Sequence, residues 1–492
     1  MTLAIVFAYL LLVLGVGLLA SRLLRRTGSD FFAASHTIGP FILLMSLFGT
    51  HMTAFSLLGA SGEAYHLGVG VFSLMASASA LVVPAVTLLL APRVWRLGKT
   101  NGFLTQVEMV EARWESPRLG LALFAVLTLL LVPYLLIGVL GGGITLAEIT
   151  GGQVPQWLGS LVVSAVVLAY VAAGGVRGAA WANTFQTLVF MALGALTFLV
   201  IVRELGGLEA ALDRVDPALL AHGEGIPAAK LLSYTLLPLS VATFPHLFLH
   251  WLTARGTKTF ELTVVAYPLC LLPVWIPSVL LGVLGSAAVP GLEGPAANSV
   301  LIAMIDRFAP GVLAGLLAAG VLAAVMSSLD SQVLALSTLF TRRLGRRRQV
   351  SGSDGREVLL GRLFVAGILA LTYALSLVVE RSIFRLGVWS FTGFAALAPL
   401  IFAAVYWKRS TRAGAWACLG TVAALWLGFF WSVGDEPGWS VAGTGLLPVV
   451  VITAASTLAL VGVSLLTPPP SAAALARFFP AAGPERRREE AA

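Results

Sequence analysis

Two short segments of this sequence place polar residues inside otherwise apolar runs. Residues 49–53 read Gly-Thr-His-Met-Thr, and residues 324–331 read Ala-Val-Met-Ser-Ser-Leu-Asp-Ser. Within the second segment, the first residue, both adjacent serines and the last serine share one helical face, because they follow the i, i+3, i+4, i+7 spacing. Paired serine hydroxyls, together with backbone carbonyls freed by a helix break, offer sodium several neutral oxygen ligands.

Each segment also has a purely structural interpretation. Glycine and threonine in residues 49–53 allow two helices to pack closely without any break, and serine pairs are common packing residues in membrane helices. Taken singly, neither segment decides between ion binding and packing. Whether they act together depends on the elements that carry them.

The composition indicates that those elements are membrane helices. Of 492 residues, 58% are hydrophobic and 11% are charged, about half the charged share of an ordinary soluble domain. Because a bilayer core about 30 Å thick needs roughly 20 apolar residues per helix, we predict an all-α polytopic membrane protein. Its thirteen expected transmembrane helices cover residues 3–21, 38–62, 69–91, 119–147, 157–174, 180–202, 231–253, 262–288, 311–341, 363–379, 385–407, 412–432 and 445–466.

The basic residues predict how these helices are oriented in the cell (inner) membrane. The first run has no basic segment before it and is followed by Arg22, Arg25 and Arg26, so we expect a retained span rather than a signal peptide. With the N-terminus outside and the C-terminus cytoplasmic, 25 of the 31 Lys and Arg residues lie on the cytoplasmic side. The six outside are Arg203, Arg214, Lys230, Arg307, Arg381 and Arg385.

The polar inventory excludes several functions. No basic patch with interleaved aromatic residues occurs, so we expect no nucleic-acid partner. Cys270 and Cys418 lie inside apolar runs and predict neither a disulfide nor a thiolate metal site. The chain has no phosphate-binding Gly-x-x-x-x-Gly-Lys-Ser/Thr loop, which an ATP-driven pump would need. An integral-membrane enzyme is a distant alternative that no carboxylate or histidine cluster supports, so we expect neither catalytic residues nor an organic cofactor.

Asp330 is the one acidic residue predicted to lie well inside the membrane. Charged groups at that depth are costly and usually functional. The alternative is a carboxylate near a helix end that reaches interfacial water.

Taken together, the two polar segments resemble those of the sodium/solute symporter family. The resemblance covers nearly the whole chain. It is carried by residues 35–41 (Ser-His-Thr-Ile-Gly-Pro-Phe), 103–113, 174–186 (Gly-Gly…Trp-x-x-x-x-Gln), 324–328 (Ala-Val-Met-Ser-Ser), Pro399 and 406–414.

This resemblance implies a LeuT-type fold of two inverted five-helix repeats. The repeats would be spans 2–6 and 7–11, residues 38–202 and 231–407, with the first helix of each unwound at mid-membrane. Residues 1–466 would form one transmembrane domain, and residues 467–492 a cytoplasmic tail. We expect a monomer in the lipid bilayer without an obligate partner.

The resemblance also implies an ion site. Its sodium ligands would be the carbonyls of Gly49, Met52 and Ala324 and the hydroxyls of Ser327 and Ser328.

Two departures from the family concern a second ion. Many relatives have Asp where this chain has Asn183, and relatives with a second sodium tend to have Ser where this chain has Asp330. The candidates for a second ion or coupling site are therefore Asp330, Ser331 and Asn183.

The solute is expected between the two broken helices. Pro245 lacks a backbone donor and favours a break in the seventh span. The candidate substrate-binding residues are Thr50, His51, Thr53, Phe55, Phe244, His246, Phe391 and Thr392. His51 stands where proline transporters have Asp, and three roles are open to it: a donor to a solute carboxylate, a group titrating near neutral pH, or a cap on a freed carbonyl.

We therefore expect a secondary active transporter that couples sodium to uptake of a small organic solute by alternating access. Monocarboxylates, amino acids and pantothenate-like solutes all fit this expectation. The alternative is a proton-coupled symporter of the same fold, which would use Asp330 or His51 in place of the sodium site.

Overall fold

The computed structural model describes residues 2–21, 38–221, 226–348, 354–379, 382–433 and 440–480. Within these ranges the only strand-like pairing is one parallel β-bridge between Ile38 and Ala254, and the rest is helices and their connections. The predictions for Arg22, Arg25, Arg26 and Arg381, for residues 35–37 and for residues 481–492 of the tail fall outside the described residues.

Most of the chain lies in membrane-length helices. They are α1 (Thr2–Ser21), α3 (Pro40–His51) with η2 (Phe55–Gly59) and α4 (Ala60–Leu67), η4 (Ser73–Ser77) with α5 (Ala78–Asn101), α7 (Pro117–Ile149), α8 (Gln156–Glu204), α11 (Ala228–Leu236) with η5 (Leu237–Ala242) and α12 (Pro245–Thr253), α13 (Thr259–Ala288), α15 (Gly311–Arg348), α16 (Asp354–Ser376), α17 (Ile383–Tyr406), α18 (Arg412–Val433) and α19 (Pro448–Leu466).

Shorter helices connect these spans. They are η3 (Gly68–Gly70), α6 (Gln106–Arg113), α9 (Leu208–Leu212), α10 (Pro217–Leu220), η6 (Gly294–Ser299), α14 (Val300–Phe308), η7 (Val441–Gly443) and α20 (Ala472–Phe478).

The protein is an all-helical, multi-pass membrane protein. Nine helices of the described chain are long and apolar enough to cross a bilayer, or eleven when each of two bent pairs counts as one span. Two further apolar helices, Leu3–Val16 and Gln156–Ala172, are shorter. Each of the thirteen predicted spans therefore has a helical counterpart, although the first and fifth fall below the length of a full span.

Helix α8 contains the fifth and sixth predicted spans and reverses direction between them. Tyr170 and Asn183 both reach the same turn of α15, where they bond Asp330 and Ser331 respectively. The segment Ala179–Glu204 is antiparallel to α15, because Asn183 lies against Ser331 and Leu193 against Gly320. The segment Gln156–Ala172 is antiparallel to α7, because Gly159 lies against Leu146 and Val163 against Gly142. Since α7 is itself antiparallel to α15, with Gly138 against Leu329 and Gly141 against Val325, the two segments of α8 run in opposite directions.

The second predicted span is broken, as predicted. Helix α3 ends at His51, and Met52 is extended with φ −82° and ψ 112°. The helical path resumes after this residue, and the two halves are bent by 56°.

The seventh predicted span is broken as well. The two halves, Ala228–Ala242 and Pro245–Thr253, are bent by 48°. Pro245 occupies the first turn of α12 after the extended N-cap Phe244. A proline at this position is well tolerated, because the first N–H of a helix has no intrahelical partner. The predicted break is confirmed, with Pro245 starting the second half-helix rather than interrupting a continuous one.

The two broken spans are joined by backbone hydrogen bonds. The Ile38 N–H donates to the Thr253 carbonyl at 3.2 Å, and the Arg255 N–H donates to the Ile38 carbonyl at 3.0 Å. Because α3 begins directly after Ile38 and α12 ends directly before Ala254, this bridge ties one half of each broken span together. The indole N–H of Trp95 on α5 donates to the Ala254 carbonyl at 2.7 Å and fixes the same point.

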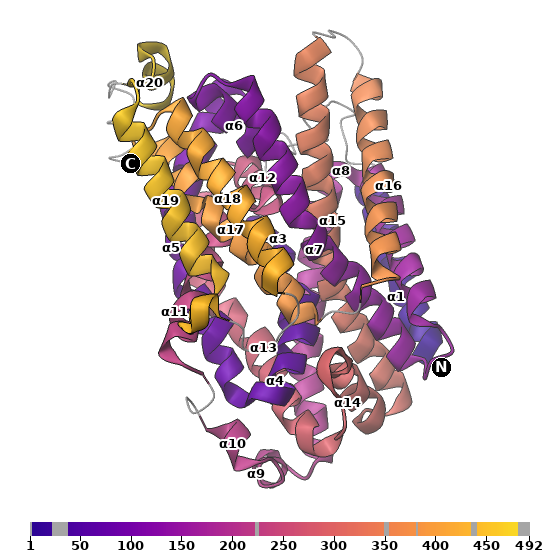
Figure 1. Ribbon diagram of the computed structural model, residues 1–492. Coiled ribbons are helices and arrows are strands. Elements are labelled where there is room, and N and C mark those ends of the chain that lie inside the picture. Colours follow the sequence, from indigo (N-terminus) through magenta and orange to yellow (C-terminus); the bar gives the residue numbers. More distant parts are fainter. Residues whose placement is uncertain are drawn as a thin grey trace.

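The bundle has two distinct ends (Figure 1). Helices α6 and α20 lie at one end, here called the α6 end, and α9, α10 and α14 lie at the other. Helix α20, the last helix of the described chain, thus lies at the α6 end.

Ion pairs attach α6 to α15. Glu108 accepts from Arg342 at 2.9 Å and Glu111 accepts from Arg343 at 2.7 Å. Helix α6 itself begins at Thr105, whose hydroxyl caps the Glu108 N–H at 3.2 Å.

Arg113 attaches α6 to the end of α17. It is fully buried, and it donates to the carbonyls of Ala404, Trp407 and Lys408 at 3.1–3.2 Å. Burial lowers the pKa of the Arg113 guanidinium to about 10, which still leaves it charged at neutral pH. The carbonyls at a helix C-terminus carry partial negative charge and stabilise that cation.

Candidate functional site

Ser327 brings the predicted sodium ligands together. Its hydroxyl donates to the Gly49 carbonyl at 2.8 Å and to the Ala324 carbonyl at 3.0 Å. One of the five predicted ligand atoms, Ser327 Oγ, therefore lies within hydrogen-bonding distance of two others, although Ser327 and Ala324 come from α15 and Gly49 from the end of α3. Ser327 and Ala324 are fully buried.

Met52 and Ser328 complete the predicted set. Met52 lies in the break, and its carbonyl accepts no hydrogen bond from the described residues. The Ser328 hydroxyl is buried and donates to the Val325 carbonyl of its own helix at 3.1 Å. The Met52 carbonyl is therefore free to bind a cation, and the Ser328 hydroxyl can offer a cation the lone pairs of its oxygen.

Gly49 allows α3 to approach α8 closely. A Cβ at this position would overlap the Thr187 hydroxyl and lie 3.2 Å from Thr187 Cβ. Thr187 is held there because its hydroxyl donates to the Met45 carbonyl at 2.9 Å. Position 49 therefore requires glycine for steric reasons. The close approach of the two helices also sets where the Gly49 carbonyl lies.

A second polar cluster lies beside the first. Asn183 donates to the hydroxyls of Thr50 at 2.9 Å and Ser331 at 2.6 Å, and Thr50 donates to Ser331 at 2.9 Å. The structure thus places Thr50, predicted to bind substrate, with two of the residues predicted to hold a second ion. All three side chains are buried.

His250 of α12 closes this cluster. Its ring nitrogens lie 3.3–3.4 Å from the hydroxyls of Ser46, Thr50 and Ser331. The sequence reasoning did not assign His250 a role. Its spacing of four residues from His246 on one helix was the signal that could have identified it.

Asp330 faces protein. It is fully buried, and its Oδ2 accepts from the Tyr170 hydroxyl on α8 at 3.0 Å, whereas Oδ1 has no hydrogen-bond partner. This side chain therefore does not reach interfacial water. Tyr170 was also missed, because a single tyrosine in an apolar run carries no distinguishing pattern.

His51 bonds a tyrosine rather than a backbone carbonyl. Its Nδ1 pairs with the Tyr267 hydroxyl of α13, and the two rings stack with centroids 5.9 Å apart. His51 is only partly buried, in contrast to Thr50 and Met52 on either side. Tyr267 is a further contact that the sequence reasoning did not predict.

Four of the predicted substrate residues, Phe55, Phe244, His246 and Phe391, meet in an aromatic cluster. Phe244 lies 5.2 Å from Tyr134 of α7, 4.9 Å from His246 and 5.5 Å from Phe391 of α17, measured between ring centroids. Phe55 joins through Phe391 at 4.9 Å. We call these five side chains the aromatic cluster. The predicted residue Thr392 is buried on α17 directly after Phe391.

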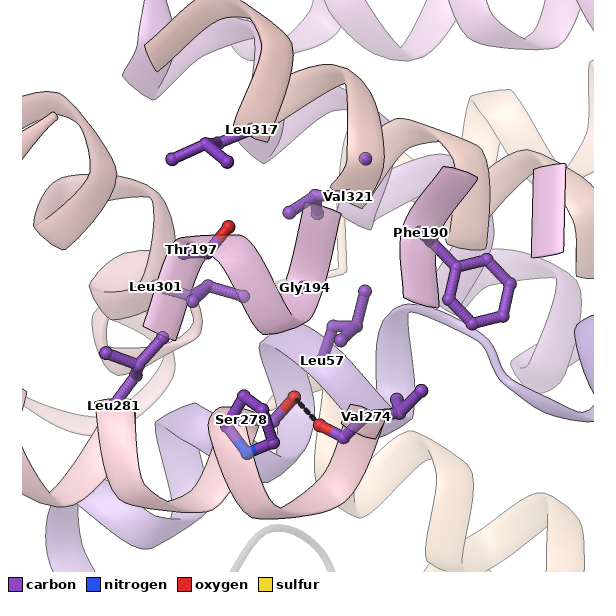
Figure 2. Close-up of a pocket in the computed structure, with 12 residues that line it drawn as sticks. Leu57, Phe190, Gly194, Thr197, Val274, Ser278, Leu281, Leu301, Leu317 and Val321 are labelled. Atoms are coloured by element: carbon purple, nitrogen blue, oxygen red, sulfur yellow. Dashed lines mark hydrogen bonds between the residues drawn. The ribbon is translucent and has the colours of Figure 1, made fainter. Parts of the chain in front are cut away.

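A small apolar crevice of about 20 Å³ lies between α8, α13 and α15 (Figure 2). Its two hydroxyls bond their own helices, Ser278 to the Val274 carbonyl at 2.8 Å and Thr197 to the Leu193 carbonyl at 2.7 Å. The crevice offers a solute no free polar group and is therefore not the transport site. Its other lining residues are Leu57, Phe190, Gly194, Pro277, Leu281, Leu301, Leu317, Gly320 and Val321.

Residues 31–421 match the family model of the sodium:solute symporter family. The chain belongs to this family. It is accordingly a sodium-coupled solute symporter and not an enzyme.

Curated relatives match this symporter over most of their length. The sodium/pantothenate symporter of Escherichia coli is 27% identical, with 86% of this chain and 91% of that protein covered. The osmoregulated proline transporter OpuE of Bacillus subtilis is 26% identical over 81% of this chain and 83% of its own. The sodium/proline symporter of Escherichia coli is 24% identical over 82% and 83% respectively.

Solved structures confirm the predicted fold. A Na⁺-coupled sialic acid symporter in a substrate-bound outward-open state superposes with a TM-score of 0.78 at 16% identity, covering 96% of this chain and 98% of that one. A nucleobase-cation-symport-1 family transporter in a closed conformation gives a TM-score of 0.64 at 15% identity, covering 91% and 97%. The symporter thus has the LeuT-type fold predicted for it.

Proposed function

We propose that sodium binds where α3 breaks beside α15, held by the carbonyls of Gly49, Met52 and Ala324 and the hydroxyls of Ser327 and Ser328. The observation that carries this proposal is the meeting of Ser327 Oγ with the Gly49 and Ala324 carbonyls at 2.8 and 3.0 Å. A cation among these oxygens holds the broken helix against α15. Binding of the ion thereby favours one arrangement of the two elements, which is what coupling requires.

The solute binds beside this ion, between the two broken spans. The aromatic cluster lies against the N-terminal end of α12, and Phe55 reaches it from the first break. Relatives named for proline and pantothenate transport are similar over most of the chain, which supports a small organic solute here too. The symporter works as a monomer.

Asp330, Ser331 and Asn183 form the candidate for a second ion or coupling site. Ser331 and Asn183 bond each other at 2.6 Å, and Asp330 precedes Ser331 on α15. Asp330 keeps one oxygen without a partner. A buried carboxylate without a compensating group is costly, so a cation at this oxygen is favourable.

The sodium site is tested by removing each serine hydroxyl. Ser327→Ala or Ser328→Ala should raise the sodium concentration for half-maximal uptake about tenfold or more, because a lost buried polar ligand costs about 1–3 kcal/mol. The matched control is Ser278→Ala on α13, whose hydroxyl bonds only its own helix. Sodium dependence in the double mutant Ser327→Ala/Ser328→Ala that equals the wild type would exclude this site.

The second site is tested with Asp330→Asn in proteoliposomes. The measurement is the number of sodium ions that move with each solute, read from uptake against imposed gradients. A changed stoichiometry with an intact fold supports the site. A wild-type stoichiometry assigns Asp330 a structural role only.

A further inference from the structure

Helices α6 and α20 meet at the α6 end of the bundle (Figure 1). A cavity of about 470 Å³ lies between them, bounded also by the end of α5. Its described lining includes no residue of the aromatic cluster and none of the proposed sodium ligands. The cavity is therefore separate from the proposed transport site.

Aromatic contacts hold α20 at this cavity. Phe478 of α20 is 5% exposed and stacks on Phe103 of the cavity wall, with ring centroids 6.1 Å apart. The guanidinium of Arg113 on α6 lies 5.9 Å from the centre of the Phe478 ring. Arg477, the residue directly before Phe478, is thereby placed in the wall of the cavity.

The two walls carry free charges of opposite sign. Glu115, which follows α6, and Arg477 on α20 both line the cavity and are exposed, yet neither bonds the other or any other described residue. Glu111, the other carboxylate of the lining, is already paired with Arg343 at 2.7 Å. The cavity therefore has one free anion on the α6 wall and one free cation on the α20 wall.

Asn101 adds a neutral acceptor to the lining. Its side-chain nitrogen donates to the carbonyl four residues earlier in α5 at 3.0 Å. The amide oxygen is left to accept a hydrogen bond. The wall opposite α20 is thus suited to a donor, and Arg477 is suited to an acceptor.

Glu115 occupies a backbone position that favours glycine. Its φ is +49°, and the turn closes where the Ser116 N–H donates to the Glu111 carbonyl at 3.1 Å. The left-handed residue that follows a helix in this way is usually glycine, because a Cβ there is strained. The fold of this turn therefore does not explain a glutamate at position 115.

We propose that this cavity is a second binding site of the symporter and that it takes a small zwitterion. The ammonium group of the ligand bonds Glu115 and the Asn101 oxygen, and its carboxylate bonds Arg477. A molecule with one charge of each sign gives both free residues a charged hydrogen-bond partner, whereas a singly charged molecule leaves one of them unpaired. The bound ligand fastens α20 to α6, which ion pairs attach to α15.

The test is a thermal-shift titration of the purified full-length symporter in detergent, in potassium buffer without sodium. The probe is ε-aminocaproate. Its controls are N-acetyl-ε-aminocaproate, which keeps only the negative charge, and ε-aminocaproamide, which keeps only the positive one. We expect ε-aminocaproate to raise the melting temperature, and the half-saturating concentrations of both controls to be about tenfold higher or more. A control that titrates like the zwitterion, or a zwitterion without effect, overturns the proposal.

Single variants locate the ligand. Arg477→Gln should raise the half-saturating ε-aminocaproate concentration about tenfold. Glu115→Gly should do the same while raising the melting temperature of the ligand-free protein, because glycine relieves the left-handed backbone. Arg412→Gln is the matched control, since Arg412 is another exposed arginine and does not line the cavity. Wild-type titrations of Arg477→Gln and Glu115→Gly would place the probe elsewhere and overturn the site.

A charge exchange separates binding from a structural role. The double variant Glu115→Arg/Arg477→Glu should bind ε-aminocaproate within about threefold of the wild type, because the zwitterion can bind in the reverse direction. Binding as weak as in Arg477→Gln would contradict the pairing of charges. The wild-type titration should also be the same in sodium as in potassium buffer. Binding that requires sodium would assign the probe to the transport site and overturn the proposal.

Discussion

Gly49 shows how a single residue type sets the geometry of an ion site. Its missing Cβ lets α3 lie directly on Thr187 of α8, and its carbonyl then meets the Ser327 hydroxyl. A larger residue would push α3 away from α8 and move this carbonyl. The position of a proposed sodium ligand is therefore decided by a contact with α8, which is not the helix that carries Ser327.

We predict that Gly49→Ala raises the half-saturating sodium concentration at least tenfold, because overpacking a buried contact costs about 1–3 kcal/mol. Thr187→Ala in the same chain should restore part of the loss, since it removes the overlapping hydroxyl. Gly39→Ala is the control, because a Cβ there meets nothing within 4 Å. Sodium-dependent uptake in vesicles measures all three. A wild-type response of Gly49→Ala would contradict the steric explanation.

His51 and Tyr267 form a pair that acts as a unit. We predict that His51→Phe and Tyr267→Phe weaken solute binding to a similar extent, and that the double mutant is no worse than either single one. The reason is that each change removes the same hydrogen bond, so their effects are not additive. Apparent solute affinities of the four proteins form the cycle. Additive effects would show that His51 contacts the solute independently of Tyr267.

At the scale of single residues, the sequence predicts those site residues that belong to a recognisable spacing pattern. It does not predict those that stand alone in an apolar run. The serine pair on α15 was found because its spacing marks a helix face, and the structure brings Ser327 to Gly49. Tyr134, Tyr170 and Tyr267 were missed because each stands alone in an apolar run. Their partners lie more than 100 positions away in the chain, and only the fold shows such contacts.

At the scale of elements, both breaks and all thirteen helical segments could be predicted from apolar length and from glycine or proline at mid-span. The reversal inside α8 could be predicted as well, because the predicted spans 157–174 and 180–202 end within two residues of Gln156–Ala172 and Ala179–Glu204. The crevice between α8, α13 and α15 could not be predicted at all (Figure 2). The shape of the crevice depends on how Gly194 of α8 and Gly320 of α15 pack against the neighbouring helices.

The two glycines of this crevice make opposite predictions. A Cβ at Gly194 would meet only the Pro273 carbonyl, at 3.7 Å, whereas a Cβ at Gly320 would lie 2.7 Å from Leu193 Cβ. Gly194→Ala should therefore stabilise the protein by up to about 1 kcal/mol, because alanine favours the helix. Gly320→Ala should destabilise it by about 1–3 kcal/mol through overpacking. Thermal unfolding of the purified variants decides this, and an equal effect of both would contradict the packing described.

At the scale of the whole molecule, orientation in the membrane is the main property still to be tested. The α6 end contains α6, the basic end of α15 and the C-terminal helix α20 (Figure 1). We propose that this end is cytoplasmic, because of its excess of Lys and Arg. On this proposal the opposite end, with α9 and α10, faces outward.

We predict that a membrane-impermeant maleimide added to intact cells labels Glu209→Cys and does not label Ala476→Cys. Both positions are exposed, the first on α9 and the second on α20. The wild type serves as the unlabelled control, because Cys270 and Cys418 are buried. Permeabilised cells should label both variants. Labelling of only Ala476→Cys in intact cells would invert the orientation.

The bridge between Ile38 and Ala254 has a consequence for energy conversion. It fastens α3, which carries the proposed ion ligand Gly49, to α12, which is proposed to line the solute site. A rigid connection of this kind prevents either half-helix from swinging open alone, because two backbone hydrogen bonds would break in the process. Ion and solute are then released through one common opening. We infer that such a mechanical linkage disfavours slippage, the futile passage of an ion without cargo.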